Sequence, residues 1–233
     1  MGMERYDGCK QGVLSASLWL SGHGYFGSPR GTGGNVSVRV GGEDAMAITP
    51  SGARYQDLTA SDICIVGLDL GLIEATGAHK PSVESGMHGI IYRNRPDVNA
   101  VVHTHQPYGS VLAVLGMPIP ALFDEAAFSL GRSVEVVHYA PPGSLELVEN
   151  VGRKLQNNAN AYLMENHGVL VLGEDLEQTL FHAELLEKTA RIYCLALSTG
   201  REVRTLPGPV AEMVQAHRDR EVREAGNRRK EKA

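Results

Sequence analysis

Two histidines one residue apart, His103 and His105, follow an apolar run of mostly β-branched residues at 98–102. Side chains at positions i and i+2 of an extended strand point to the same side, so both imidazoles can reach one ion. Gln106 and Pro107 end the run at once, which places the pair at the carboxyl end of a strand. Ligands bind at that edge in open α/β sheets, and neutral imidazole is a common zinc ligand. Taken alone, the pair is also compatible with two solvated histidines.

Further candidate ligands lie on both sides of this strand in the sequence. Glu84 follows Pro81 and Ser82 at the expected start of a helix, and His167 follows another apolar segment. Three imidazoles that leave one position open are typical of a catalytic zinc site, whereas structural sites use four ligands and usually cysteine. Glu84 also has a simpler interpretation, because an acid near a helix N-terminus complements the helix dipole.

Two turns rich in small residues could bind an anion. The first is Gly31-Thr32-Gly33-Gly34-Asn35, and the second is Thr49-Pro50-Ser51-Gly52. Backbone N–H groups in such loops can approach an anion closely, and hydroxyl and amide side chains add further donors. Each stretch is equally interpreted as a tight turn, so phosphate binding and a purely structural role both stay open.

The composition is that of an ordinary globular protein. The chain has 233 residues, 42% of them hydrophobic and 21% charged, with a formal net charge of −5. A chain with this negative net charge lacks the basic excess expected of a nucleic-acid binder. Its three cysteines are odd in number and widely spaced, which favours a reducing compartment over a disulfide scaffold. Since neither a secretory signal nor an apolar run of membrane-spanning length is evident, we expect a cytoplasmic protein without a membrane partner.

Hydrophobic periodicity and turn residues predict alternating helices and strands. We expect helices at 7–20, about 82–95, 110–115, 144–156 and 175–197, and strands at 36–40, 45–49, 62–66, 71–74, 98–102, 134–137, 161–163 and 169–172. Hairpins mixed with helical crossovers indicate an α/β protein with a three-layer α/β/α architecture and a mixed central sheet. No linker divides the chain, so we expect a single domain over 1–233, with a flexible charged carboxyl-terminal tail from about residue 218.

Five short motifs together suggest a family. In the order in which they occur, they are Gly33-Gly34-Asn35-Val36-Ser37, Thr49-Pro50-Ser51-Gly52, Pro81-Ser82-Val83-Glu84, His103-Thr104-His105 and Asn166-His167-Gly168. With them, nearly the whole chain resembles the class II aldolase family of zinc-dependent sugar-phosphate enzymes, which includes fuculose-1-phosphate aldolase and ribulose-5-phosphate 4-epimerase. Any one motif is weak, but the ordered set is specific.

The resemblance implies a role for each of these residues. His103, His105 and His167 would bind one Zn²⁺ per chain, with Mn²⁺ or Co²⁺ as alternatives, and Glu84 would be the acid/base and also a metal ligand. Phosphate would be held by the small-residue turns, at Thr32, Gly34, Asn35, Ser51, Gly52 and Ser82. The resemblance also implies a homotetramer acting on a small-molecule substrate.

Three departures from the family pattern limit the choice of substrate. Aldolases similar to this chain often have a second serine where Val83 stands, and valine cannot donate a hydrogen bond to phosphate. Asp124 stands where the fuculose-1-phosphate aldolases place a tyrosine, and no tyrosine follows Tyr193 to match their second one. The epimerase typically has aspartate where this chain has Glu84.

The leading hypothesis is a metal-dependent lyase that performs retro-aldol cleavage of a small phosphorylated ketose through a metal-stabilised enediolate. The alternatives are a decarboxylase of a 3-oxo or dihydroxy-aromatic acid that uses the same metal site, a sugar-phosphate 4-epimerase, and a non-catalytic relative with a degenerate site. The first two differ in product, an aldehyde or carbon dioxide. The presence of all four metal-pocket residues disfavours the non-catalytic relative.

Overall fold

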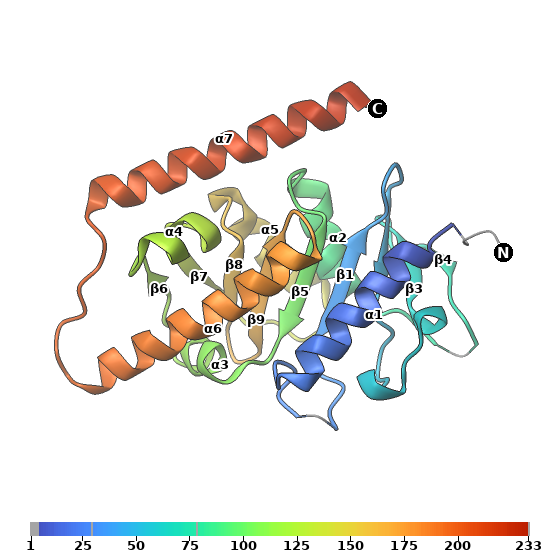
Figure 1. Ribbon diagram of the computed structural model, residues 1–233, viewed down its shortest axis with the longest axis horizontal. Coiled ribbons are helices and arrows are strands. Elements are labelled where there is room, and N and C mark those ends of the chain that lie inside the picture. The colour runs from blue at the N-terminus through green and yellow to red at the C-terminus, as the bar shows by residue number, and fades with distance from the viewer. Residues whose placement is uncertain (1–4, 29, 78, 233) are drawn as a thin grey trace.

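The central feature of the computed structural model, which describes residues 5–28, 30–77 and 79–232, is a nine-stranded mixed sheet in the order β4-β3-β2-β1-β5-β9-β8-β7-β6 (Figure 1). Among these strands, β7 and β8 are parallel and the other neighbours are antiparallel. The strands are β1 (Asn35–Arg39), β2 (Ala45–Ile48), β3 (Cys64–Gly67), β4 (Leu72–Glu74), β5 (Ala100–Thr104), β6 (Ile119–Pro120), β7 (Ser133–Val137), β8 (Ala161–Met164) and β9 (Gly168–Gly173). The predicted mixed sheet is therefore confirmed.

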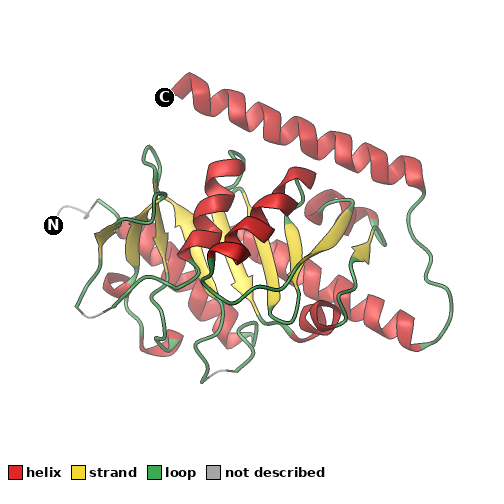
Figure 2. Ribbon diagram, turned by 180° about the vertical axis from the view of Figure 1, so that it is seen from behind, coloured by secondary structure: helices red, strands yellow, loops and turns green. Residues whose placement is uncertain are grey.

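Helices cover both faces of the sheet, as Figures 1 and 2 show from opposite sides. The helices are α1 (Asp7–Gly22), α2 (Ser85–Asn94), α3 (Pro107–Val114), α4 (Asp124–Leu130), α5 (Leu145–Lys154), α6 (Leu176–Ser198) and α7 (Gly208–Lys232), with short 3-10 turns at Tyr55–Asp57, Ala60–Asp62 and Leu155–Asn157. Helices α1, α3, α4 and α6 lie on one face, and α2 and α5 on the other. None of the helices in the described ranges is apolar over a length that would cross a membrane.

The two apolar cores follow from the twofold alternation of side chains along each strand. In β2, Ala45 and Ala47 join the core under α1, α3, α4 and α6, whereas Met46 and Ile48 join the core under α2 and α5. In β5, Val102 faces the first core and Val101 the second. A sheet that is buried on both faces needs apolar residues on both, which explains the continuous apolar runs that predicted its strands.

Helix α2 begins later than the sequence predicts. Pro81 and Ser82 were expected to open the helix, but Pro81 forms an isolated bridge with Pro50, and the Ser82 N–H donates to the Thr49 carbonyl at 3.1 Å. This extended pairing delays the helix to Ser85, so Glu84 is its N-cap residue rather than part of its first turn.

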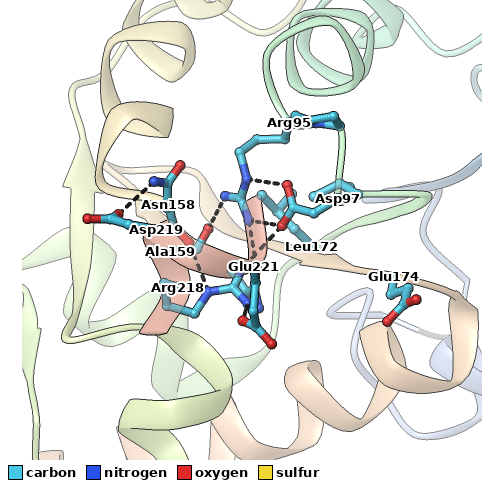
Figure 3. Close-up of polar contacts among 12 residues, drawn as sticks. Arg95, Asp97, Asn158, Ala159, Leu172, Glu174, Arg218, Asp219 and Glu221 are labelled. Carbon is cyan, nitrogen blue, oxygen red and sulfur yellow. Dashed lines mark hydrogen bonds and ion pairs between the residues drawn. The ribbon is translucent and has the colours of Figure 1, made fainter. Parts of the chain in front are cut away.

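The charged carboxyl-terminal segment, which was expected to fray from about residue 218, is helical in the structure. Helix α7 runs across the end of the sheet that lies opposite to the head of the β5 arrow (Figure 1). Arg218 is 7% exposed, and its guanidinium donates to Asp97 at 3.2 Å and to Asn160 at 2.7 Å. Asp97 also pairs with the buried Arg95 at 2.7 Å, so one carboxylate joins the helix to the loop before β5 (Figure 3). Buried guanidiniums need partners of this kind, and these contacts join α7 to the loop before β5.

Candidate metal centre

The three predicted histidines meet beside the carboxyl end of β5. His103 is the fourth residue of β5, His105 follows its last residue, and His167 lies in the turn between β8 and β9. Their candidate ligand atoms all lie within 4.8 Å of one another. Asn166 lies in this turn and has a φ of 53°, a left-handed conformation that asparagine tolerates better than most residues. Antiparallel pairing of β9 with both β5 and β8 is what brings His167 to the His-x-His pair.

The hydrogen bonds of His103 set its ring for metal binding. Its Nδ1 lies 2.8 Å from the Val169 carbonyl, so Nδ1 carries the proton and Nε2 presents a lone pair. That Nε2 faces Nε2 of His105 at 3.0 Å. Two nitrogens on one tetrahedral zinc ion, each about 2.0–2.1 Å from it, lie about 3.3 Å apart, so the observed spacing fits a shared ion.

Burial favours the neutral form of His103 and His105. His103 is fully buried, and desolvation, with the neighbouring His167 and His105, holds its pKa well below the usual range. Desolvation also lowers the pKa of His105. Metal ligation requires the neutral ring, so the site favours the protonation state that binds a cation.

Glu84 lies directly beside the imidazoles and is 5% exposed. Its Oε2 lies 3.5 Å from Nε2 of His103, and its Oε1 lies 3.6 Å from Nε2 of His167. Since His103 is neutral and carries its proton on Nδ1, its Nε2 approaches Glu84 as a lone-pair atom and not as the cation of an ion pair. Glu84 Oε1 and His167 Nδ1 are buried without a hydrogen-bond partner among the described residues. An orphaned carboxylate oxygen beside three imidazoles fits a bound divalent cation.

Two glycines allow the backbone to approach this cluster. Gly34 has a φ of 74°, and a Cβ there would lie 2.6 Å from the His103 carbonyl oxygen. At Gly168, a Cβ would overlap the Thr104 carbonyl oxygen and lie 2.7 Å from Cδ2 of His105. The glycines in these two motifs therefore have a steric reason for their position.

We expect Gly168→Ala to lower the free energy of unfolding by about 1–3 kcal/mol and to reduce metal content, because β9 would have to move away from His105. Gly41→Ala is the matched control, since a Cβ at Gly41 meets nothing within 4 Å. Thermal unfolding and metal analysis of both variants check the prediction. Equal metal content in the two variants would contradict it.

The second predicted anion-binding turn, 49–52, lies beside the motif at 81–84, which contains the further candidate contact Ser82. The Ser51 N–H donates to the Lys80 carbonyl at 2.8 Å, next to the bridge that joins Pro50 and Pro81. Ser51 and Gly52 are exposed, and Gly52 has a φ of 69°. Ser82 is buried, and its Oγ accepts from the Glu84 N–H at 3.2 Å. The bridge between Pro50 and Pro81 therefore brings the turn at 49–52 beside the segment that ends at Glu84, the N-cap residue of α2.

The glycine-rich turn contacts the site through Asn35. Thr32 is exposed, whereas Asn35 is 3% exposed and pairs in register with His103 across β1 and β5. The Asn35 Nδ2 donates to Glu84 Oε2 at 2.7 Å. Because an amide nitrogen carries two hydrogens, one remains for a substrate.

Sequence reasoning missed two polar residues behind Glu84, namely His88 and Tyr92, and did not connect Ser37 of the first motif with them. His88 and Tyr92 are buried on α2, and Ser37 is buried on β1. Glu84, His88 and Tyr92 are spaced four residues apart and therefore share one helix face. That spacing was visible in the sequence and could have identified them.

The family assignment follows from the comparisons with known proteins. The model of the class II aldolase and adducin N-terminal domain matches residues 11–194. The chain therefore belongs to the class II aldolase family.

Several relatives of this chain are named as aldolases that act on sugar phosphates. The chain is 37% identical over 162 residues to L-fuculose phosphate aldolase of Methanococcus maripaludis, covering 70% of this chain and 84% of that protein. It is 37% identical over 207 residues to 5-methylthioribulose-1-phosphate/5-deoxyribulose-1-phosphate aldolase of Rhodospirillum rubrum, covering 88% of each. A solved L-fuculose 1-phosphate aldolase has a TM-score of 0.83 at 33% identity, covering 93% of this chain and 97% of that one. These similarities confirm the expected family and fold, and they indicate aldolase-type chemistry on sugar phosphates.

Proposed function

We propose that the protein is a metal-dependent aldehyde-lyase that cleaves a ketose 1-phosphate into dihydroxyacetone phosphate and an aldehyde. The observation that carries the proposal is the position of Glu84. Its Oε1 is buried beside the imidazoles and has no hydrogen-bond partner among the residues that the structure describes. The substrate class is supported by relatives named for ketose phosphates.

The residues fit a resident divalent cation, held by His103, His105 and His167, with Glu84 as a further ligand in the free enzyme. Nitrogen-rich sites with an open position favour zinc among the available ions, and Mn²⁺ or Co²⁺ is the alternative. When bound, the cation would supply Lewis-acid stabilisation of the negative charge that develops on the ketone oxygen.

Glu84 would handle the proton at the carbon next to the ketone. In the direction of cleavage, the C3–C4 bond of the ketose breaks and its electron pair moves into the enediolate. The C4 hydroxyl gives its proton to solvent as the aldehyde forms. The Glu84 carboxyl protonates C3 to give dihydroxyacetone phosphate, and the resulting carboxylate takes up a proton from solvent. In the direction of addition, the Glu84 carboxylate removes that proton. Its close approach to the imidazoles supports this role.

The phosphate would be bound by the adjoining turns, with Thr32, Gly34, Asn35, Ser51, Gly52 and Ser82 as candidate contacts. Val83 is 65% exposed and offers no donor at its position in this motif. We therefore propose a phosphate site that is present but lacks one hydrogen bond.

We expect Ser51→Ala to raise KM for a phosphorylated ketose more than it lowers kcat, because a remote handle contributes mostly uniform binding. Val83→Ser should act in the opposite direction and tighten binding by about 0.5–1.5 kcal/mol, the net contribution of one hydrogen bond. Inorganic phosphate should compete with the substrate. The measurement is steady-state kinetics, with the corresponding unphosphorylated ketose as the control substrate. If phosphate does not compete and both variants behave as wild type, the two turns have no role in binding phosphate.

The function is tested by incubating metal-loaded protein with a panel of ketose 1-phosphates and 3-oxo acids. The proposal requires dihydroxyacetone phosphate and an aldehyde from at least one ketose 1-phosphate. Release of carbon dioxide from a 3-oxo acid, without cleavage of any ketose, would favour the decarboxylase. An unphosphorylated substrate of that kind would not need the hydrogen-bond donor that Val83 lacks. Conversion of a pentulose phosphate into its C4 epimer would favour the epimerase.

The expected homo-oligomer remains a prediction. It is supported by exposed apolar side chains that follow one another on α3 and just after it, at Val111, Val114 and Leu115. Contiguous apolar surface of this kind is typical of subunit interfaces.

A further inference from the structure

A buried chain of polar side chains leads from the core to Glu84. The Tyr92 hydroxyl lies 2.7 Å from Ser37 Oγ, which lies 2.6 Å from Nδ1 of His88. Nε2 of His88 lies 2.5 Å from Asn35 Oδ1, and the Asn35 Nδ2 lies 2.7 Å from Glu84 Oε2. All five residues are buried.

This chain forms because two periodicities coincide. Asn35 and Ser37 are two residues apart on β1 and point to the same face of the sheet. Glu84, His88 and Tyr92 lie one helical turn apart along α2 and its N-cap, on the face that packs against that side of the sheet. Residues of the helix and of the strand therefore alternate along the chain of hydrogen bonds.

Each hydrogen bond in the chain has one allowed direction. The Asn35 NH₂ donates to Glu84 Oε2, so the amide oxygen of Asn35 faces His88. Nε2 of His88 must then carry a hydrogen. Complete burial lowers the pKa of His88 to about 3, so the ring is neutral and Nδ1 is bare. Ser37 therefore donates to Nδ1 and accepts from Tyr92, and every donor in the chain points toward Glu84.

Glu84 depends on this contact for its position. Its carboxylate makes no side-chain cap with the helix that it precedes, and Oε1 has no hydrogen-bond partner in the described part of the chain. The hydrogen bond from Asn35 is therefore what orients the carboxylate. A flipped Asn35 amide would place oxygen against the carboxylate and NH₂ against the Nε2–H of His88, and both contacts are repulsive. In a dry interior such mismatches cost more than they do in water.

We propose that His88 is a positioning residue: it locks the Asn35 amide in the orientation that holds Glu84 in place for proton transfer. The proposal rests on the function proposed above for Glu84. It assigns no contact between His88 and the substrate or metal, because His88 acts through Asn35.

A double-mutant cycle tests the route through Asn35. We expect His88→Leu to lower kcat by about 10- to 100-fold, the scale of a misplaced catalytic group, with KM changed less than about twofold. In the Asn35→Ala background the same substitution should have little further effect, because residues acting in series are not additive. His88→Gln, whose amide can still donate to Asn35, should recover part of the lost rate. Effects of His88→Leu and Asn35→Ala that multiply independently would overturn the proposal.

The matched control is His182→Leu. His182 is likewise buried, but it lies on α6 and bonds the Leu172 carbonyl at 2.7 Å, away from Glu84. It should lose stability as His88→Leu does and keep the wild-type kcat. An equal loss of kcat in both variants would show a general effect of disturbing the core and would contradict the positioning role.

A second readout does not depend on activity or on variants that fold. In metal-free wild-type protein labelled with ¹⁵N-histidine, the nitrogen shifts of His88 should show the Nε2–H tautomer with a bare Nδ1. An Nδ1–H tautomer would overturn the proposal whether or not the enzyme is active. If the wild type cleaves ketose phosphates but the cycle is additive, the positioning role alone fails. If no substrate is cleaved while the tautomer is as expected, the failure lies with the proposed function.

Discussion

Replacing Glu84 with glutamine is expected to lower turnover by roughly 10²- to 10⁴-fold, the usual contribution of a general acid/base. Glutamine retains the shape of the side chain and can accept the hydrogen bond from Asn35, but it cannot take up or release a proton at the substrate carbon. The fold should therefore persist while the chemistry is lost. The measurement is kcat with circular dichroism and metal analysis on the same sample.

The alternative for Glu84 is a charge that complements the dipole of α2. In that case the substitution would cost about 1 kcal/mol of stability or less and leave the rate near wild type. Glu125→Gln is a suitable control because Glu125 is an exposed acid in the first turn of α4. A kcat for Glu84→Gln that matches the control would remove Glu84 from the mechanism.

Replacing any one of His103, His105 and His167 with alanine is expected to abolish stoichiometric metal binding and, with it, activity. Each variant removes one of three strong ligands whose atoms meet within 4.8 Å. Changing residues that merely orient a ligand typically lowers metal affinity by about 10- to 100-fold, so losing a ligand should cost more. We expect about one divalent ion per chain in the wild type and far less in each variant, measured by elemental analysis after dialysis.

His138→Ala provides the control for these three variants. Its side chain is 79% exposed and lies outside the cluster, so this variant should retain the metal. Full metal content in any one of the three cluster variants would exclude that histidine from the site.

The three histidines of the candidate site could be predicted because their signals are local. A His-x-His pair at the end of an apolar run fixes which way both side chains point, since strand periodicity leaves no other choice. His167 was accessible for a similar reason, because it stands between two apolar runs that form neighbouring strands. What the sequence could not show is that β9 pairs with β5, and that pairing brings the third histidine to the other two.

Other features depend on contacts between distant segments. Strand β6 has two residues and helix α4 has seven, too few for a periodic pattern to stand out. The start of α2 was placed too early because the bridge between Pro50 and Pro81 competes with the helix. The helical order of the charged α7 segment depends on Asp97, 121 residues before Arg218. No local pattern in the sequence predicts these two contacts or the two short elements.

The hydrogen-bond chain behind Glu84 could be predicted only in part from the sequence. The four-residue spacing of Glu84, His88 and Tyr92 was visible, but the partners on β1 depend on how the helix packs on the sheet. The direction of the bonds could be derived only after the contacts were known. Buried polar residues at helical spacing opposite a polar strand face are therefore worth examining in related sequences.

Hydrogen exchange into dihydroxyacetone phosphate tests the central claim most directly, because it needs no knowledge of the aldehyde. Metal-loaded protein would be incubated with this compound in D₂O without any aldehyde, and the hydroxymethyl protons followed by ¹H NMR. If Glu84 transfers the proton at this carbon, one of the two protons should be replaced by deuterium in the wild type, and both should remain with Glu84→Gln or chelated protein. A metal-loaded wild type that leaves both protons in place would contradict the proposed aldolase mechanism.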